Sequence, residues 1–216
     1  MDYFISDMHF GHKNIIRFCD RPFDSVSEMN SEIIKKWNAV VTDSDRVFVV
    51  GDVFLCAAQE AKLYIQELKG YKILIKGNHD LPKPEMISVG FDEYHRSLDY
   101  TMPDGRIALL KHYPVPDCLL DKYDLMIHGH IHISERVRGK KINVSCDIWE
   151  FTPISVEELS KLDIDRDVNH DSEFVKISVS EDKMLTIHTT IPMLDFSGFT
   201  DHVYKQMDGM WTRSRK

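Results

Sequence analysis

Short apolar runs alternate with amphipathic segments along the first half of the chain. The runs share β-branched and aromatic residues, which favour strands: 3–5, 46–50 and 71–75. Between them, the spacing of apolar positions predicts helices that begin near Asn14, follow Ser25 and cover 57–69. This alternation is typical of an α/β domain built in layers.

Two of the predicted helices begin with a capping-box spacing. Ser25 and Glu28 lie three residues apart before one apolar stripe, and Ser155 and Glu158 repeat the arrangement later in the chain. In such a box each side chain satisfies a backbone N–H group at the helix start. Both serines therefore mark helix N-termini.

After a short helix over 84–89, the pattern changes to hairpin-like pieces. The expected strands are 98–101, 107–110, 125–127 and 142–145, the first two joined by an Asp-Gly turn. A polar segment, 163–171, is the best linker candidate. We therefore divide the chain into a core domain, 1–162, and a C-terminal extension, 163–216, which contains a predicted hairpin (174–179 and 184–190) and an aromatic tail expected to pack on the core.

Five of the predicted strands end in polar clusters of residue types that bind metals. The clusters contain Asp7 and His9; Asp52; Asn78, His79 and Asp80; His112; and His128, His130 and His132. Each cluster alone is a weak signal, but together they follow one rule. Because open α/β sheets place their sites at the carboxyl ends of strands, we expect these side chains to meet.

The residue types also restrict which ion could bind. Carboxylate, amide and imidazole ligands suit divalent ions such as Mn²⁺, Fe²⁺, Zn²⁺ and Co²⁺. The four cysteines are widely scattered, with no spacing typical of a structural zinc site. We therefore expect a catalytic type of metal centre.

The order of these clusters resembles the signature of the calcineurin-like metallophosphoesterase superfamily. That signature runs Asp-x-His, Gly-Asp, Gly-Asn-His-Asp, a lone His and Gly-His-x-His, and every position is filled here, within residues 2–160. The stretch 5–16 looks like the small single-domain bacterial and phage members. The resemblance implies a four-layer α/β/β/α sandwich with its site at one sheet edge.

The resemblance also implies a role for each cluster residue. One metal ion would be held by Asp7, His9, Asp52 and His132, and a second by Asp52, Asn78, His112 and His130, so that Asp52 bridges. Two divalent ions, with Mn²⁺ the first choice, would hold and deprotonate a bridging water that attacks phosphorus. His79 would act on the leaving group, as general acid or charge stabiliser.

Further residues near the clusters are expected to support this centre. Asp80 and His128 would orient the ligands from behind. His12, Asn14 and Arg17 follow the first ligands and could contact substrate phosphate, the alternative being a solvated helix start. A later basic run, 136–141, is interpreted as a hairpin of solvated charges, with phosphate binding as its alternative.

Composition narrows the class of substrate and partner. The chain has 27 Lys plus Arg against 35 Asp plus Glu, a net charge of −8, which argues against a nucleic-acid coat or an anionic-membrane binder. We expect a cytoplasmic monomer or homodimer that hydrolyses a small phosphate ester or nucleotide. The alternatives are a nuclease of the same superfamily and a non-catalytic interaction module on the same fold.

Overall fold

The computed structural model describes residues 1–164, 175–179 and 185–189. Its first sheet has the strand order β10-β1-β2-β3-β4. The strands are β1 (Asp2–Ile5), β2 (Arg46–Val49), β3 (Tyr71–Ile75), β4 (Glu93–His95) and β10 (Ile154–Ser155). β1 to β4 run parallel, and β10 pairs antiparallel with β1. The carboxyl ends of β1, β2 and β3 therefore share one edge.

The second sheet has the order β5-β6-β7-β9-β8. Its strands are β5 (Leu98–Thr101), β6 (Ile107–Leu110), β7 (Leu125–His128), β8 (Val137–Arg138) and β9 (Lys141–Asn143). β6, β7 and β9 are parallel, while β5 and β8 form antiparallel hairpins with β6 and β9. This sheet also presents three strand ends at one edge.

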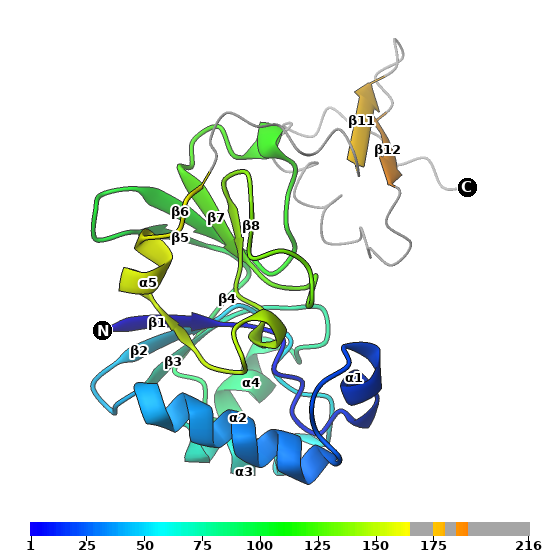
Figure 1. The fold of residues 1–216 in the computed structure, drawn as a ribbon, viewed down its shortest axis with the longest axis vertical. Helices are drawn as coiled ribbons and strands as arrows, with labels where there is room; N and C mark the ends of the chain where they lie inside the picture. Colours follow the sequence, from blue (N-terminus) through cyan, green and yellow to red (C-terminus); the bar gives the residue numbers. More distant parts are fainter. Residues whose placement is uncertain (165–174, 180–184, 190–216) are drawn as a thin grey trace.

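Helices cover the first sheet on the side away from the second (Figure 1). They are α2 (Val26–Val40), α3 (Ala58–Glu67) and α4 (Lys83–Val89), while the short α1 (Lys13–Phe18) follows β1 and α5 (Val156–Ser160) follows β10. Two short 3-10 helices, η1 (Asp117–Leu119) and η2 (Cys146–Ile148), lie in loops. The expected α/β sandwich is confirmed.

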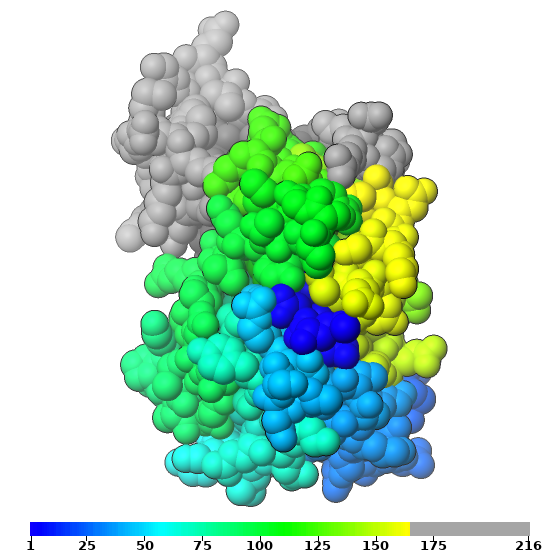
Figure 2. All heavy atoms as spheres, turned by 90° about the vertical axis from the view of Figure 1, so that its left-hand side faces the viewer, coloured from blue at the N-terminus to red at the C-terminus, as the bar shows by residue number. Residues whose placement is uncertain are grey.

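Residues of the first sheet alternate between two hydrophobic cores. Ile5, Val49 and Leu74 pack into the core beneath the helices, whereas Phe4 and Phe48 face the core shared with the second sheet. Because successive side chains of a strand point to opposite faces, a strand buried on both sides reads as continuous apolar sequence. Figure 2, viewed from the end where β1 begins, shows N-terminal atoms in the middle of this face, surrounded by atoms of later segments.

The helix starts confirm the predicted caps with one difference. At α5 both halves of the capping box form, between Ser155 and Glu158. At α2 the Ser25 hydroxyl accepts the Glu28 N–H group, but the Glu28 carboxylate accepts from the backbone of Asp24 instead. The box at α2 is therefore half formed.

Several short elements differ from those predicted by the sequence. The two-residue and three-residue strands β4, β8 and β10 were not predicted. The basic run does form the β8–β9 hairpin, but its charges are not simply solvated: Lys141 is buried against Asp117, and Lys140 donates to the backbone carbonyls of Leu120 and Tyr123. The interpretation as solvated charges was wrong for these lysines.

The predicted C-terminal hairpin is confirmed as β11 (Val175–Val179) paired antiparallel with β12 (Leu185–Thr189). Nearly all of the proposed linker and all of the aromatic tail lie outside the described residues. Among the residues that are described, no helix is long and apolar enough to cross a membrane.

Candidate metal centre

The candidate ligands lie where the two sheets meet. Beyond β1, Ser6 forms a parallel bridge with Ser145, which follows β9. The Ser6 N–H group donates to Val144 O at 2.9 Å, and Cys146 N–H donates to Ser6 O at 2.9 Å. This contact joins the strand ends of both sheets at a single edge. The clusters that follow β1, β2, β3, β6 and β7 converge there, as the sequence rule predicted.

The ligand atoms form two groups. In the first group, one atom each from Asp7, His9 and His132 lie within 4.8 Å of one another; the second group contains Asp52, His112 and His130 with the same spacing. Asp52 Oδ2 lies 3.7 Å from His9 Nε2 and 3.4 Å from His112 Nε2. One carboxylate oxygen therefore faces both groups.

Two residues after β3 complete this arrangement. Asn78 Oδ1 lies 3.0 Å from His112 Nε2, beside the second group. His79 Nε2 lies 3.9 Å from Asp52 Oδ2, and its side chain is 44% exposed. The Asn78 amide oxygen thus adds to the ligand types available, and the His79 ring reaches the same carboxylate from the solvent side.

Unusual backbone geometry is concentrated at these residues. Five of the seven candidate ligands have positive φ angles between 42° and 74°: Asp7, His9, Asp52, His130 and His132. Such angles are uncommon for residues with a Cβ atom, and they persist where the surrounding structure holds them for a function. The bent backbone brings both carboxylates and these three histidines to the same edge.

Two glycines make this close approach possible. A Cβ atom on Gly129 would lie 2.6 Å from Asp7 Oδ2, and a Cβ atom on Gly77 would overlap the Asp52 carboxylate. Only glycine leaves that space. Gly129 and Gly77 therefore allow carboxylates that follow other strands, Asp7 and Asp52, to approach the backbone closely.

Burial keeps two of the histidines neutral. It lowers the pKa of His9 to about 2 and that of His130 to about 3. His9 Nε2 is buried and has no hydrogen-bond partner among the described residues. An orphaned buried ring nitrogen facing carboxylates is unusual in a folded protein. A cation held between these groups would satisfy it, because a metal ion binds the neutral imidazole.

The other two histidines are held by their second ring nitrogen. His112 Nδ1 lies 2.8 Å from the backbone oxygen of Val50, and His132 Nδ1 lies 2.8 Å from Asp147 Oδ2. Burial favours the neutral rings, but Asp52 outweighs it and raises the pKa of His112 to about 9, while Asp147 raises the pKa of His132 to about 10. In each case Nε2 is left facing the other candidate ligands.

The two residues expected to support the centre differ in their contacts. The buried Asp80 carboxylate accepts backbone N–H groups of Asp52, Val53 and Gly77 at 2.7–3.0 Å. Among the described residues, the buried His128 ring forms a hydrogen bond only with the Gly129 carbonyl oxygen. Asp80 thus fixes the loop of a candidate ligand directly, whereas His128 contacts the backbone beside His130.

The three residues suggested for substrate contact are also separated. His12 lies at the centre: its Nδ1 is 3.4 Å from His9 Nδ1, and burial lowers its pKa. Asn14 and Arg17 lie on the exposed surface of α1, and the Arg17 guanidinium lies over the Phe18 ring. Only His12 contacts the ligand cluster itself.

The sequence as a whole matches a known protein family. A family model for calcineurin-like phosphoesterases matches residues 3–203. The chain belongs to the calcineurin-like phosphoesterase family. The resemblance carried by the ligand clusters is thereby confirmed.

Relatives of this calcineurin-like phosphoesterase occur in archaea, phages and bacteria. The chain is 37% identical over 169 residues to the uncharacterized protein MJ1445 of Methanocaldococcus jannaschii, covering 74% of this chain and 89% of the relative. It is 28% identical to the gene 66 protein of Mycobacterium phage L5, covering 68% and 86%. The crystal structure of AQ665, a protein of unknown function from Aquifex aeolicus, has a TM-score of 0.62 and 29% identity, covering 76% of this chain and 99% of that one.

Sequence reasoning missed three residues that contact the ligands of this phosphoesterase. Asp147 bonds His132, Arg21 bonds Asp147, and the Tyr113 ring lies 4.3 Å from the His130 ring between centroids. Asp147 follows the predicted strand 142–145 by two residues, so the rule that found the other clusters also reaches it. Arg21 carries no comparable signal, because it lies in a loop.

Proposed function

We propose that this protein is a metal-dependent phosphoester hydrolase with a dinuclear centre, a phosphodiesterase or phosphatase for small phosphate esters or nucleotides. The observation that carries the proposal is the position of Asp52. Its carboxylate lies between two groups of candidate ligands, one of which contains the orphaned Nε2 of His9. Family membership supports the same reaction class.

The two groups would hold one ion each. Asp7, His9 and His132 fit the first ion; Asn78, His112 and His130 fit the second; and Asp52 would contact both. Mn²⁺ is our first choice, with Fe²⁺, Zn²⁺ and Co²⁺ as alternatives, because carboxylate and amide oxygens suit Mn²⁺ while the imidazoles also suit the other ions. When bound, such ions lower the pKa of a water molecule and neutralise phosphoryl charge.

His79 is the candidate proton donor. Its ring is 44% exposed and lies beside the Asp52 carboxylate, and its backbone N–H group donates to Asp52 Oδ1 at 3.0 Å. An imidazole in this position can give a proton to the leaving-group oxygen as the phosphorus–oxygen bond breaks. Alkoxide leaving groups would depend on it most.

His12, Asn14 and Arg17 are proposed to contact the substrate. His12 lies against His9, and the two other side chains extend from α1 toward solvent on the same segment. Arginine and asparagine side chains can donate to phosphate oxygens. Contacts outside the metal ligands would select the organic part of the ester.

Metal analysis is the first test. Protein purified without chelators should carry close to two transition ions per chain after dialysis against Mn²⁺, and Asp52→Asn should lose most of them. His95→Ala is a suitable control, since His95 pairs with Glu93 in β4 rather than with the centre. Fewer than about one ion per chain in the unmodified protein would favour the interaction module.

Activity is tested with a panel of phosphomonoesters, phosphodiesters, cyclic nucleotides and labelled single- and double-stranded DNA, each with Mn²⁺, Zn²⁺ and Mg²⁺. Hydrolysis of an alkyl phosphate ester that falls by about 100-fold in His79→Ala supports the proposal. Cleavage confined to DNA would replace it with the nuclease alternative, and full activity of Asp52→Asn would refute it.

A further inference from the structure

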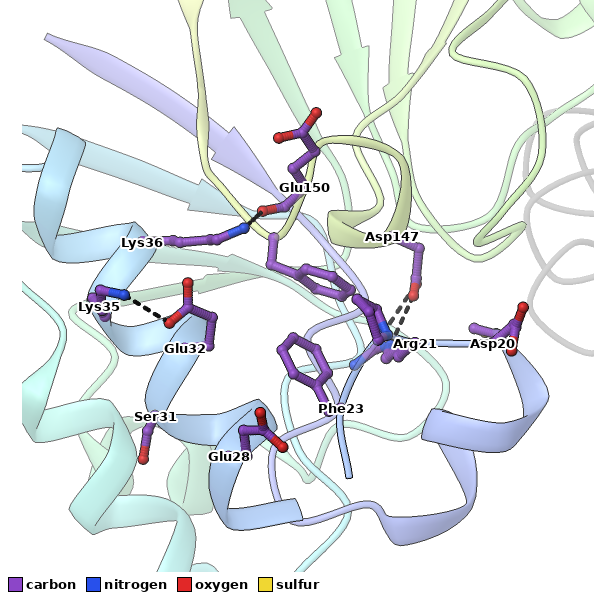
Figure 3. Close-up of a pocket in the computed structure, with 13 residues that line it drawn as sticks. Asp20, Arg21, Phe23, Glu28, Ser31, Glu32, Lys35, Lys36, Asp147 and Glu150 are labelled. Atoms are coloured by element: carbon purple, nitrogen blue, oxygen red, sulfur yellow. Dashed lines mark hydrogen bonds and ion pairs between the residues drawn. The ribbon is translucent and has the colours of Figure 1, made fainter. Parts of the chain in front are cut away.

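A buried ion pair lies directly behind the first ligand group. The Arg21 guanidinium donates from Nε to Asp147 Oδ1 at 2.7 Å and from Nη2 to Oδ2 at 3.1 Å. The Arg21 and Asp147 side chains are 0% and 2% exposed. Arg21 and Asp147, which belongs to η2, line a pocket of about 630 Å³, and Figure 3 shows the two side chains joined by dashed lines. A fully desolvated pair of this kind is retained only where its hydrogen bonds are nearly complete.

The pair touches the first ligand group from two directions. Asp147 Oδ2 also accepts from His132 Nδ1 at 2.8 Å. Arg21 Nη2 donates to the backbone oxygen of Asp7 at 2.7 Å, and Nη1 donates to the oxygen of Met8 at 2.9 Å. These carbonyls belong to the turn in which Asp7 and His9 have positive φ. The Arg21 guanidinium therefore connects the Asp7–His9 turn to the Asp147 carboxylate, which holds the His132 ring.

Cys19, His132 and Asp147 also lie close enough to suggest a third metal site. The Arg21 contacts argue against it, because a buried guanidinium donates to both oxygens of Asp147 and places a positive charge where the ion would lie. The Phe151 ring covers the guanidinium at 5.5 Å and keeps it from water. Asp147 is better suited to orient His132 than to bind an ion.

We propose that Arg21 and Asp147 are positioning residues for the first ligand group. Asp147 fixes the His132 ring with Nδ1–H inward and Nε2 toward Asp7 and His9, and Arg21 holds Asp147 and the Asp7–His9 turn in one geometry. This inference rests on the proposed metal centre. Second partners of metal-binding histidines generally set ring orientation and basicity.

Titration with Mn²⁺ tests the proposal without using activity. Asp147→Asn keeps the size of the side chain but removes the charge that holds the His132 ring. We expect the ion of the first ligand group to bind about 10- to 100-fold more weakly, which is the range for the loss of a second partner of a metal-binding histidine. The ion of the second group should keep its affinity. Arg21→Lys keeps the positive charge but loses the two N–H groups that reach both Asp147 oxygens. It should weaken binding of the same ion.

Asp2→Asn provides a matched control. Asp2 also forms a two-point pair with an arginine, Arg46, at 2.8 and 2.6 Å, but it does so at the other end of β1. This variant should bind both ions as the unmodified protein does. Circular dichroism in EDTA establishes that each variant is folded; if Asp147→Asn is not, Arg21→Lys provides the decisive titration.

A double-mutant cycle separates positioning from general destabilisation. If Asp147 acts through His132, adding Asp147→Asn to His132→Ala should change Mn²⁺ affinity less than about two-fold, because the ring it orients is gone. Equal effects in both backgrounds, or unchanged two-ion binding in both single variants, would overturn the positioning role. Failure of the unmodified protein to bind any ion would instead refute the metal centre.

Discussion

The two candidate ligand groups are supported in different ways. The first, with Asp7, His9 and His132, is supported by side chains: Arg21 and Asp147 approach from segments 126 residues apart. The support of the second group acts through the backbone. Val50 O accepts from His112, and backbone N–H groups around Asp52 are fixed by the Asp80 carboxylate.

This difference indicates how each group responds to change. The side-chain support of the first group can be removed by one substitution that leaves the strands intact. The first group should therefore lose its ion without loss of the second ion or of fold stability. The support of the second group acts on backbone groups just beyond β2 and β3, so its removal, even by substitution of Asp80, disturbs the backbone itself. The second group should therefore change together with the stability of the fold.

Asp52→Asn should weaken ion binding in both ligand groups, since Asp52 Oδ2 faces both. Each ion of the proposed centre would supply several kcal/mol of charge stabilisation in the transition state, and the loss of both should lower kcat/KM by more than about 10⁴-fold. Steady-state assay and metal content of the same preparation check this. A variant that bound one ion normally would show that Asp52 serves a single group.

His79→Ala should leave both ligand groups intact and still lower the activity. Its ring is exposed and lies outside the two groups, so the ions should remain, while loss of a general acid lowers kcat by about 100-fold. The loss should be much smaller for a nitrophenyl ester, whose leaving group needs no proton. Comparison of alkyl and nitrophenyl esters measures this, and equal losses for both would argue against proton donation.

Much of the site could be predicted because one physical rule generates it. Apolar runs marked the strands, and residues of metal-binding type within a few positions of each run marked the strand ends. Parallel strands bring such ends together, so Asp7, Asp52 and His112 could be grouped by their positions along the chain. The family signature then supplied the roles.

Contacts made across long sequence distances could not be predicted in this way. Arg21 lies in a loop between α1 and α2, and only the fold places it against Asp147 and the Asp7 carbonyl. Short strands were missed for a similar reason. β8 and β10 have two residues each, too few for any periodicity, and they exist because a neighbouring strand offers hydrogen bonds.

Asp80→Asn should affect the second group and the fold together. Three backbone N–H groups point at the Asp80 oxygens, and the amide nitrogen of asparagine cannot accept from them. An unsatisfied buried donor costs about 1–3 kcal/mol, so the free energy of unfolding should fall by that amount. Urea unfolding in EDTA measures this, with Mn²⁺ titration for the ions.

Asp92→Asn is the control for that substitution, because the exposed Asp92 accepts one N–H group, from Lys72. Its effect on the free energy of unfolding should stay within about 0.5 kcal/mol. If Asp80→Asn were equally mild, the second group would not depend on backbone held by this carboxylate.

The smallest effect is expected at α5, outside both ligand groups. Hydrogen bonds from the Ser155 hydroxyl and backbone N–H lower the pKa of Glu158 from 4.5. A carboxyl group whose pKa is lower in the folded state adds stability above its unfolded pKa and loses it as pH falls through the folded value. Glu158→Gln can still close a capping box but cannot titrate. Urea midpoints in EDTA should therefore fall less steeply below pH 4.5 for the variant; parallel curves would show that this cap contributes nothing to acid sensitivity.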